Sequence, residues 1–91
     1  MKDIRTTNRF LRDLKLARKR GKDLRRIEKI IDTLAHEQPL AARHRPHRLQ
    51  GVMRGLWECH VEPDWLLIWD DDDEAVTLIR TGTHLSLIHI S

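Results

Sequence analysis

The sequence has a single cysteine, Cys59, and no long apolar run. One cysteine cannot form an internal disulfide, which is typical of a protein from a reducing compartment. Its longest apolar stretches, such as residues 65–69, are far shorter than the roughly 20 residues that cross a bilayer. No basic segment near residue 1 leads into an apolar signal core. We therefore expect a cytoplasmic protein without a membrane span.

Metal-site spacings are also absent. The chain has six histidines, but it contains no His-Glu-x-x-His string and no pair of cysteines. The acidic run at residues 70–74 lacks the spaced oxygen ligands and the glycine of a calcium loop. We expect no metal and no other cofactor, and we interpret the acidic run as a solubilising turn between strands.

The chain has 91 residues, which favours a single domain over residues 1–91. Its charge is unevenly distributed. Residues 1–50 hold 15 basic and 6 acidic side chains, a net charge of +9, whereas residues 51–91 hold 2 and 8, a net charge of −6. A basic half suits a polyanionic partner such as RNA, provided that the acidic side chains face away from it.

Two amphipathic helices are predicted in the basic half. The first begins at Thr6 or Thr7, with Thr7 or Asn8 as its cap, and ends near Gly21, a residue type that commonly stops helices. The second begins after Asp23, a typical helix cap, and cannot continue past Pro39. Apolar side chains recur at helical spacing in both segments: Phe10, Leu14, Ala17, Leu24, Ile27, Ile30, Ile31 and Leu34. The two helices are expected to form a hairpin.

The second half of the sequence alternates as strands do. Strands are predicted over residues 57–61, 65–69 and 75–79, and their short connections make them antiparallel neighbours. Residues 1–4 could add a brief edge strand, and residues 38–50 are predicted to be a basic surface loop. The predicted fold is α+β, an N-terminal two-helix hairpin packed on a small antiparallel β-sheet without an internal repeat.

The histidines are candidates for chemistry without a metal. His44 and His47 lie in the basic loop, His60 lies in a predicted strand, and His84 follows the last strand. An imidazole pKa near 6.5 suits a general acid, a general base or a phosphate contact, although a surface role remains open for each one. Asp64 is either a turn residue or a carboxylate that orients a histidine.

Two further residues, Arg80 and Trp65, have two interpretations each, and Cys59 has one. Arg80 at the end of the last strand either holds a phosphate or is simply an exposed strand end. Trp65 either stacks on a base or belongs to the core. Cys59 alternates toward the core, and nothing beside it favours a lowered pKa.

Three strings in order resemble the YafQ branch of the RelE/ParE toxin superfamily. They are His-Arg-Leu-Gln-Gly at residues 47–51, Cys-His-Val-Glu-Pro-Asp-Trp-Leu-Leu-Ile at 59–68 and Arg-Thr-Gly-Thr-His at 80–84. The similarity covers nearly the whole chain. It implies a bacterial type II toxin, a small metal-independent endoribonuclease that enters the ribosomal A site, cuts messenger RNA and is held inactive by a cognate antitoxin.

The resemblance also implies a set of functional residues. The catalytic positions fall on His47, His60, Asp64 and His84, and the substrate contacts fall on Arg80, Trp65, Arg48 and Glu58. Cleavage without a metal needs a base, an acid and positive charge near the phosphate. We expect His84 to be the acid, Asp64 with His60 to form the base side, and His47 with Arg80 to hold the phosphate.

Partners follow from the same resemblance and from the charge. The basic helices and loop are expected to meet ribosomal RNA, and an antitoxin segment is expected to fold across the catalytic surface and the helices.

The C-terminal segment departs from the family pattern. Relatives close with an aromatic residue shortly after the Thr-His pair, but residues 85–91 instead read like translated sequencing adapter. We interpret them as a non-native tail, so His89 is not a ligand.

Two alternatives stay open. The superfamily includes toxins that inhibit DNA gyrase by binding, and a chain that lost its C-terminus could be a bare antitoxin- or RNA-binding module.

Overall fold

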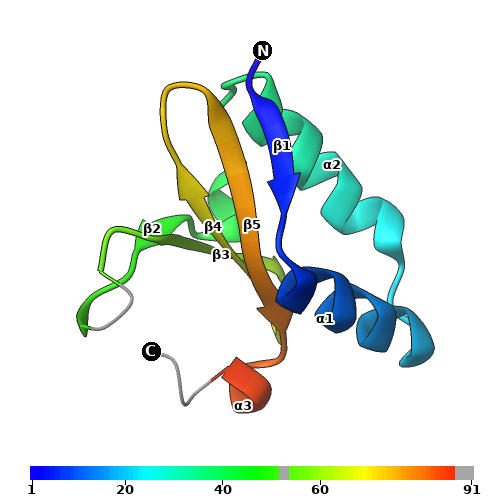
Figure 1. Ribbon diagram of the computed structural model, residues 1–91. Coiled ribbons are helices and arrows are strands. Elements are labelled where there is room, and N and C mark those ends of the chain that lie inside the picture. The colour runs from blue at the N-terminus through cyan, green and yellow to red at the C-terminus, as the bar shows by residue number, and fades with distance from the viewer. Residues whose placement is uncertain (52–53, 88–91) are drawn as a thin grey trace.

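A computed structural model describes residues 1–51 and 54–87 of the chain (Figure 1). None of the helices within these ranges is long and apolar enough to cross a membrane. Its elements in chain order are β1 (Asp3–Thr6), α1 (Asn8–Lys19), α2 (Leu24–Ala35), the 3-10 helix η1 (Ala42–His44), β2 (His47–Arg48), β3 (Trp57–Glu62), β4 (Trp65–Asp71), β5 (Ala75–Gly82) and α3 (His84–Leu87).

The strands form one five-stranded sheet in the order β1-β5-β4-β3-β2. The three predicted strands are confirmed as antiparallel neighbours, β3 with β4 and β4 with β5. The prediction of a purely antiparallel sheet is wrong at β1, which pairs in parallel with β5. The helices carry the chain away from β1 before it returns, and such a crossover allows parallel pairing. The predicted loop at residues 38–50 also contains η1 and β2.

Both helices begin at the predicted caps. The Thr7 hydroxyl accepts a hydrogen bond from the Phe10 backbone N–H, and the Asp23 carboxylate accepts one from the Arg25 N–H. These bonds satisfy donors that the first turn leaves unpaired. Gly21 adopts φ +84° after α1, a left-handed conformation that favours glycine at this position.

The main core lies between the helices and one face of the sheet. Figure 1 shows α1 and α2 on the same side of the strands. This core joins Phe10 and Ile27 from the helices to Cys59, Leu67 and other buried residues of β3, β4 and β5. The α+β fold with two helices on one face is therefore confirmed, and the opposite face is left for other contacts.

A smaller apolar cluster covers part of that opposite face. It joins Leu66 and Ile68 of β4 to Leu49 and to Leu87 of α3. Leu87 is buried in it, so this residue of the segment interpreted as a non-native tail packs against the sheet, whereas Leu85 is exposed. Residues 88–91, which include His89, lie outside the described residues.

The Cys59 thiol is expected to be inert in the native protein. Burial raises its pKa from 9.0 to about 12 because the thiolate is poorly solvated inside the core. A disulfide reagent at pH 8 should therefore react far faster in urea than in buffer. Because the unfolded chain loses this proton first, stability should also fall as the pH rises from 9.0 toward 12. Equal labelling rates with and without urea would contradict this burial.

Candidate active site

Three predicted site residues meet at one corner of the face opposite α1 and α2. His60 on β3 pairs with Leu66 on β4, and Leu66 pairs in turn with Gly82 on β5. Asp64 lies in the turn between β3 and β4, and His84 starts α3 just after Gly82. Strand register therefore brings together residues that are up to 24 positions apart in the sequence.

The two imidazoles face each other at this corner. The ring centroids of His60 and His84 are 5.4 Å apart, and their planes are inclined by 43°. Asp64 Oδ1 lies 3.6 Å from His84 Nδ1. The side chains of His84 and Asp64 are 58% and 72% exposed, so a substrate can reach them. Asp64 contacts His84, and the expected role of Asp64 with His60 as the base side stays a prediction.

A backbone carbonyl orients the ring of His60. Its Nδ1 lies 3.3 Å from the Pro63 carbonyl oxygen. Because a carbonyl only accepts hydrogen bonds, this contact favours the tautomer with hydrogen on Nδ1. The other ring nitrogen, Nε2, then carries the lone pair that a general base requires. His44 contacts the backbone of the same strand, because its Nδ1 lies 2.6 Å from the His60 carbonyl oxygen.

His47 lies farther along the same face. It is opposite Glu58 in the β2–β3 register, and its Nε2 lies 3.2 Å from Glu58 Oε1. Glu58 precedes His60 by two residues, which corresponds to about 7 Å along a strand. The neighbouring Arg48 is exposed and lies over the Trp57 ring, 5.1 Å from its centroid. His47 and Glu58 thus line one edge of the same surface, whereas Arg48 pairs with Trp57 and lies with it on the face that α1 and α2 cover.

Arg80 is not the exposed strand end that was expected. β5 continues to Gly82, and Arg80 donates from Nε and Nη2 to the two carboxylate oxygens of Asp13 at 2.9 and 3.0 Å. The Arg80 side chain is only 11% exposed, and the hydrogen bond that it donates to Asp13 raises its pKa. α1 thus supplies a counter-ion for Arg80 in this structure, and the phosphate contact stays a prediction.

Trp65 belongs to the core. It is 1% exposed, and its indole N–H donates to the Thr81 hydroxyl at 2.9 Å. A ring with both faces packed cannot stack on a base, so the predicted substrate contact at Trp65 is wrong and the core alternative is confirmed.

Comparison with known proteins connects this corner to a family. The family model described as "Bacterial toxin of type II toxin-antitoxin system, YafQ" matches residues 2–89. The chain belongs to the YafQ toxin family. Its YafQ relatives include the "mRNA interferase toxin YafQ" of Escherichia coli K12, which is 39% identical over 87 residues, 94% of this chain and 95% of the relative.

Solved YafQ structures share the fold. The crystal structure of YafQ from E. coli BL21(DE3) has a TM-score of 0.90 at 38% identity and covers 96% of this chain and 98% of that chain. The E. coli DinJ–YafQ toxin–antitoxin complex gives a TM-score of 0.88 at 39% identity, covering 94% and 96% of the two chains. The RelE-like arrangement expected from the sequence is thus confirmed.

Two residues of this YafQ-family site escaped the sequence analysis. Asp13 was one of many charges on a helix surface, and no sequence pattern linked it to Arg80. His44 was noted only as a loop histidine, because its contact with His60 depends on where η1 lies. Both act across elements distant in sequence, so only the fold brings them to their partners.

Within residues 1–51 and 54–87, no three histidine, cysteine or acidic side chains converge as a metal site would require.

Proposed function

We propose that this protein is the toxin of a type II toxin–antitoxin pair and a metal-independent endoribonuclease that cuts messenger RNA in the ribosomal A site. The observation that carries the proposal is a pair of imidazoles 5.4 Å apart, half-buried His60 and exposed His84, with a carboxylate beside His84. The name of the E. coli relative, mRNA interferase toxin, supports the same chemistry.

The two histidines differ in a way that suits opposite roles. His84 Nδ1 lies beside the Asp64 carboxylate, which can hold the imidazole ring in position, and we assign the exposed His84 as the general acid. His60 holds its Nδ1 toward a carbonyl and keeps Nε2 as the base. Asp64 acts through His84 and is a positioning residue.

The reaction then balances without a cofactor. His60 takes the proton of the ribose 2′-hydroxyl as that oxygen attacks the phosphorus. The bond from phosphorus to the 5′-oxygen breaks, and His84 gives its proton to that leaving oxygen. The products are a 2′,3′-cyclic phosphate and a 5′-hydroxyl, and the two histidines have exchanged protonation states. Solvent restores the starting states.

The negative charge on the five-coordinate phosphorus of the transition state also needs stabilisation. His47 lies on the exposed edge strand β2, on the same face of the sheet as His60. In our proposal it contacts the phosphate backbone, while Glu58 orients it through the 3.2 Å contact. Positive groups at this place lower the energy of the transition state more than that of the bound RNA.

The partners in this proposal are the ribosome and a cognate antitoxin. A net charge of +9 on residues 1–50 suits contact with ribosomal RNA, which would weaken as salt rises. The E. coli relative crystallised with DinJ as a toxin–antitoxin complex, which supports an antitoxin partner here. Such a toxin would act in the cytoplasm, where ribosomes are.

Primer extension on a translated messenger RNA tests the function. We expect cuts in phase with codons when ribosomes are present. Removing metal ions in excess of those that the ribosomes need, with a chelator, should leave these cuts unchanged. Naked RNA at the same protein concentration should stay intact. Cuts without codon phase, or no cuts with active translation, would contradict a ribosome-dependent nuclease.

A further inference from the structure

The proposed base, His60, lies where the pairing of β3 becomes irregular. On one side, β2 pairs with β3 at Trp57 and Glu58 alone among the described residues. On the other side, the register with β4 shifts between His60 and Glu62. A shift of this kind disrupts the local ladder of backbone hydrogen bonds. The sheet therefore supports His60 less than it supports the start of β3.

The His44 side chain continues the hydrogen bonding beyond the end of β2. Directly before β3, the Leu56 carbonyl oxygen accepts the backbone N–H of Leu49 at 2.8 Å. Backbone groups of every second strand residue point toward the same neighbour, so the carbonyl of His60 faces this edge too. There His44 Nδ1 lies 2.6 Å from the His60 oxygen. Because a carbonyl only accepts, His44 is the donor of this hydrogen bond.

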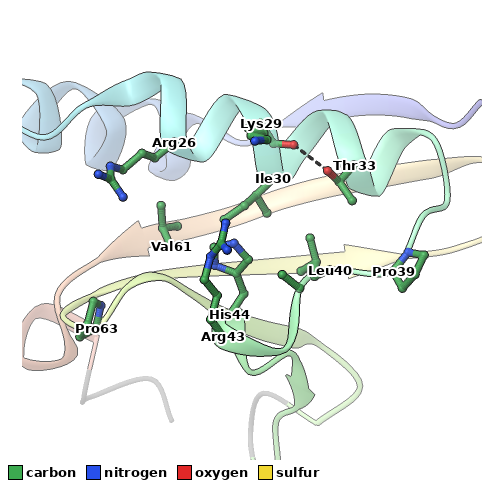
Figure 2. A pocket seen from close by; sticks show the side chains of 11 residues that line it. Arg26, Lys29, Ile30, Thr33, Pro39, Leu40, Arg43, His44, Val61 and Pro63 are labelled. Carbon is green, nitrogen blue, oxygen red and sulfur yellow. Dashed lines mark hydrogen bonds between the residues drawn. The ribbon is translucent and has the colours of Figure 1, made fainter.

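The short helix η1 holds His44 at this position. The His44 backbone N–H donates to the Ala41 carbonyl at 3.0 Å, and Arg45 ends the turn in a left-handed conformation with φ +46°. Figure 2 shows His44 among the side chains that line the space between α2 and η1, together with Leu40 and Val61. The His44 side chain is half-buried there. A defined turn thus presents the donor to β3.

We propose that His44 is a positioning residue for the general base His60. Its hydrogen bond fixes the backbone of β3 at the point where the His60 side chain begins. That placement keeps His60 Nδ1 beside the Pro63 carbonyl oxygen, at 3.3 Å, and so leaves Nε2 free to take the proton of the 2′-hydroxyl. His44 does not touch the RNA. This inference rests on the nuclease function proposed above.

Nitrogen-15 NMR of the imidazoles in the full chain tests the positioning without any cleavage assay. At about pH 8, where imidazoles are neutral, His60 should carry its hydrogen on Nδ1. His44→Phe keeps a ring at this place but removes the donor, and it should move His60 toward the form with hydrogen on Nε2. His44→Gln, which retains an N–H donor, should restore much of the original signal, and His36→Ala should change nothing. Unchanged His60 signals in His44→Phe would overturn the proposal.

Single-turnover cleavage on translating ribosomes completes the experiment, after a urea melt has shown that each variant is folded. His44→Phe should lower the maximal rate by about 10- to 100-fold, the usual cost of a small misplacement, and leave the half-saturating toxin concentration within about threefold. His44→Gln should recover most of that rate. A raised half-saturating concentration at an unchanged maximal rate would mean that His44 binds RNA, and it would overturn the proposal. An unaltered protein that shows the expected NMR signals but cuts nothing would contradict the nuclease and not the contact.

Discussion

Replacing His84 by alanine is expected to slow messenger RNA cleavage by about 100- to 10,000-fold, the usual contribution of a positioned general acid. The 5′-oxygen would then depart without a proton, because no other histidine within the described residues faces His60. The fold should survive, since the His84 side chain is 58% exposed and its contact with Asp64 is long and solvated. Single-turnover cleavage and a urea melt measure the two effects.

His36 provides the matched control for this variant. Its Nδ1 lies 3.5 Å from Asp32 Oδ1 on α2, and both side chains are exposed, as they are at His84 and Asp64. His36→Ala removes a similar ion pair far along the chain from the corner, and it should leave the cleavage rate within about twofold. Loss of cleavage in both variants, or in neither, would remove His84 from the mechanism.

Replacing Asp13 by alanine is expected to lower the free energy of unfolding by about 3 to 5 kcal/mol, because it leaves a buried guanidinium without its counter-ion. The Asp13 and Arg80 side chains are only 13% and 11% exposed. The Thr81 backbone N–H would also lose its acceptor, which lies at 3.2 Å. Arg80 Nη1 is already buried without a partner, so the site has no spare acceptor among the described residues.

Urea unfolding with a double variant checks that explanation. Asp13→Leu combined with Arg80→Met removes both charges, and it should recover much of the stability that Asp13→Ala loses. Asp32→Ala, which removes an exposed carboxylate from α2, should change stability by less than about 0.5 kcal/mol. A loss below about 1 kcal/mol for Asp13→Ala would show that the ion pair is solvated in solution.

Local signals predicted most of the elements. The caps at Thr7 and Asp23 and the alternation of Cys59 with His60 depend on neighbours within a few residues, so the sequence carries them. The parallel pairing of β1 does not have such a signal. Four exposed residues at Asp3–Thr6 give no alternation, and their place beside β5 follows from the route of the helices.

Only part of the site could be predicted, because only part of it depends on local sequence signals. His60, Asp64 and His84 were found through strings that resemble a family, and strand register then placed them at one corner. Arg80 looked like an exposed strand end because its partner Asp13 lies 67 positions away. A bulge where β4 pairs with β5 further disturbs the simple alternation near Arg80. Contacts of this kind need the tertiary fold.

The most direct test of the account compares single-turnover cleavage rates of His60→Ala, His84→Ala and the double variant on translating ribosomes. If the two imidazoles serve one reaction as base and acid, each single variant should lose most of the rate, and the double variant should be scarcely slower than the slower single one. Independent losses that multiply in the double variant, or near-normal cleavage in any of the three, would contradict a shared acid–base site.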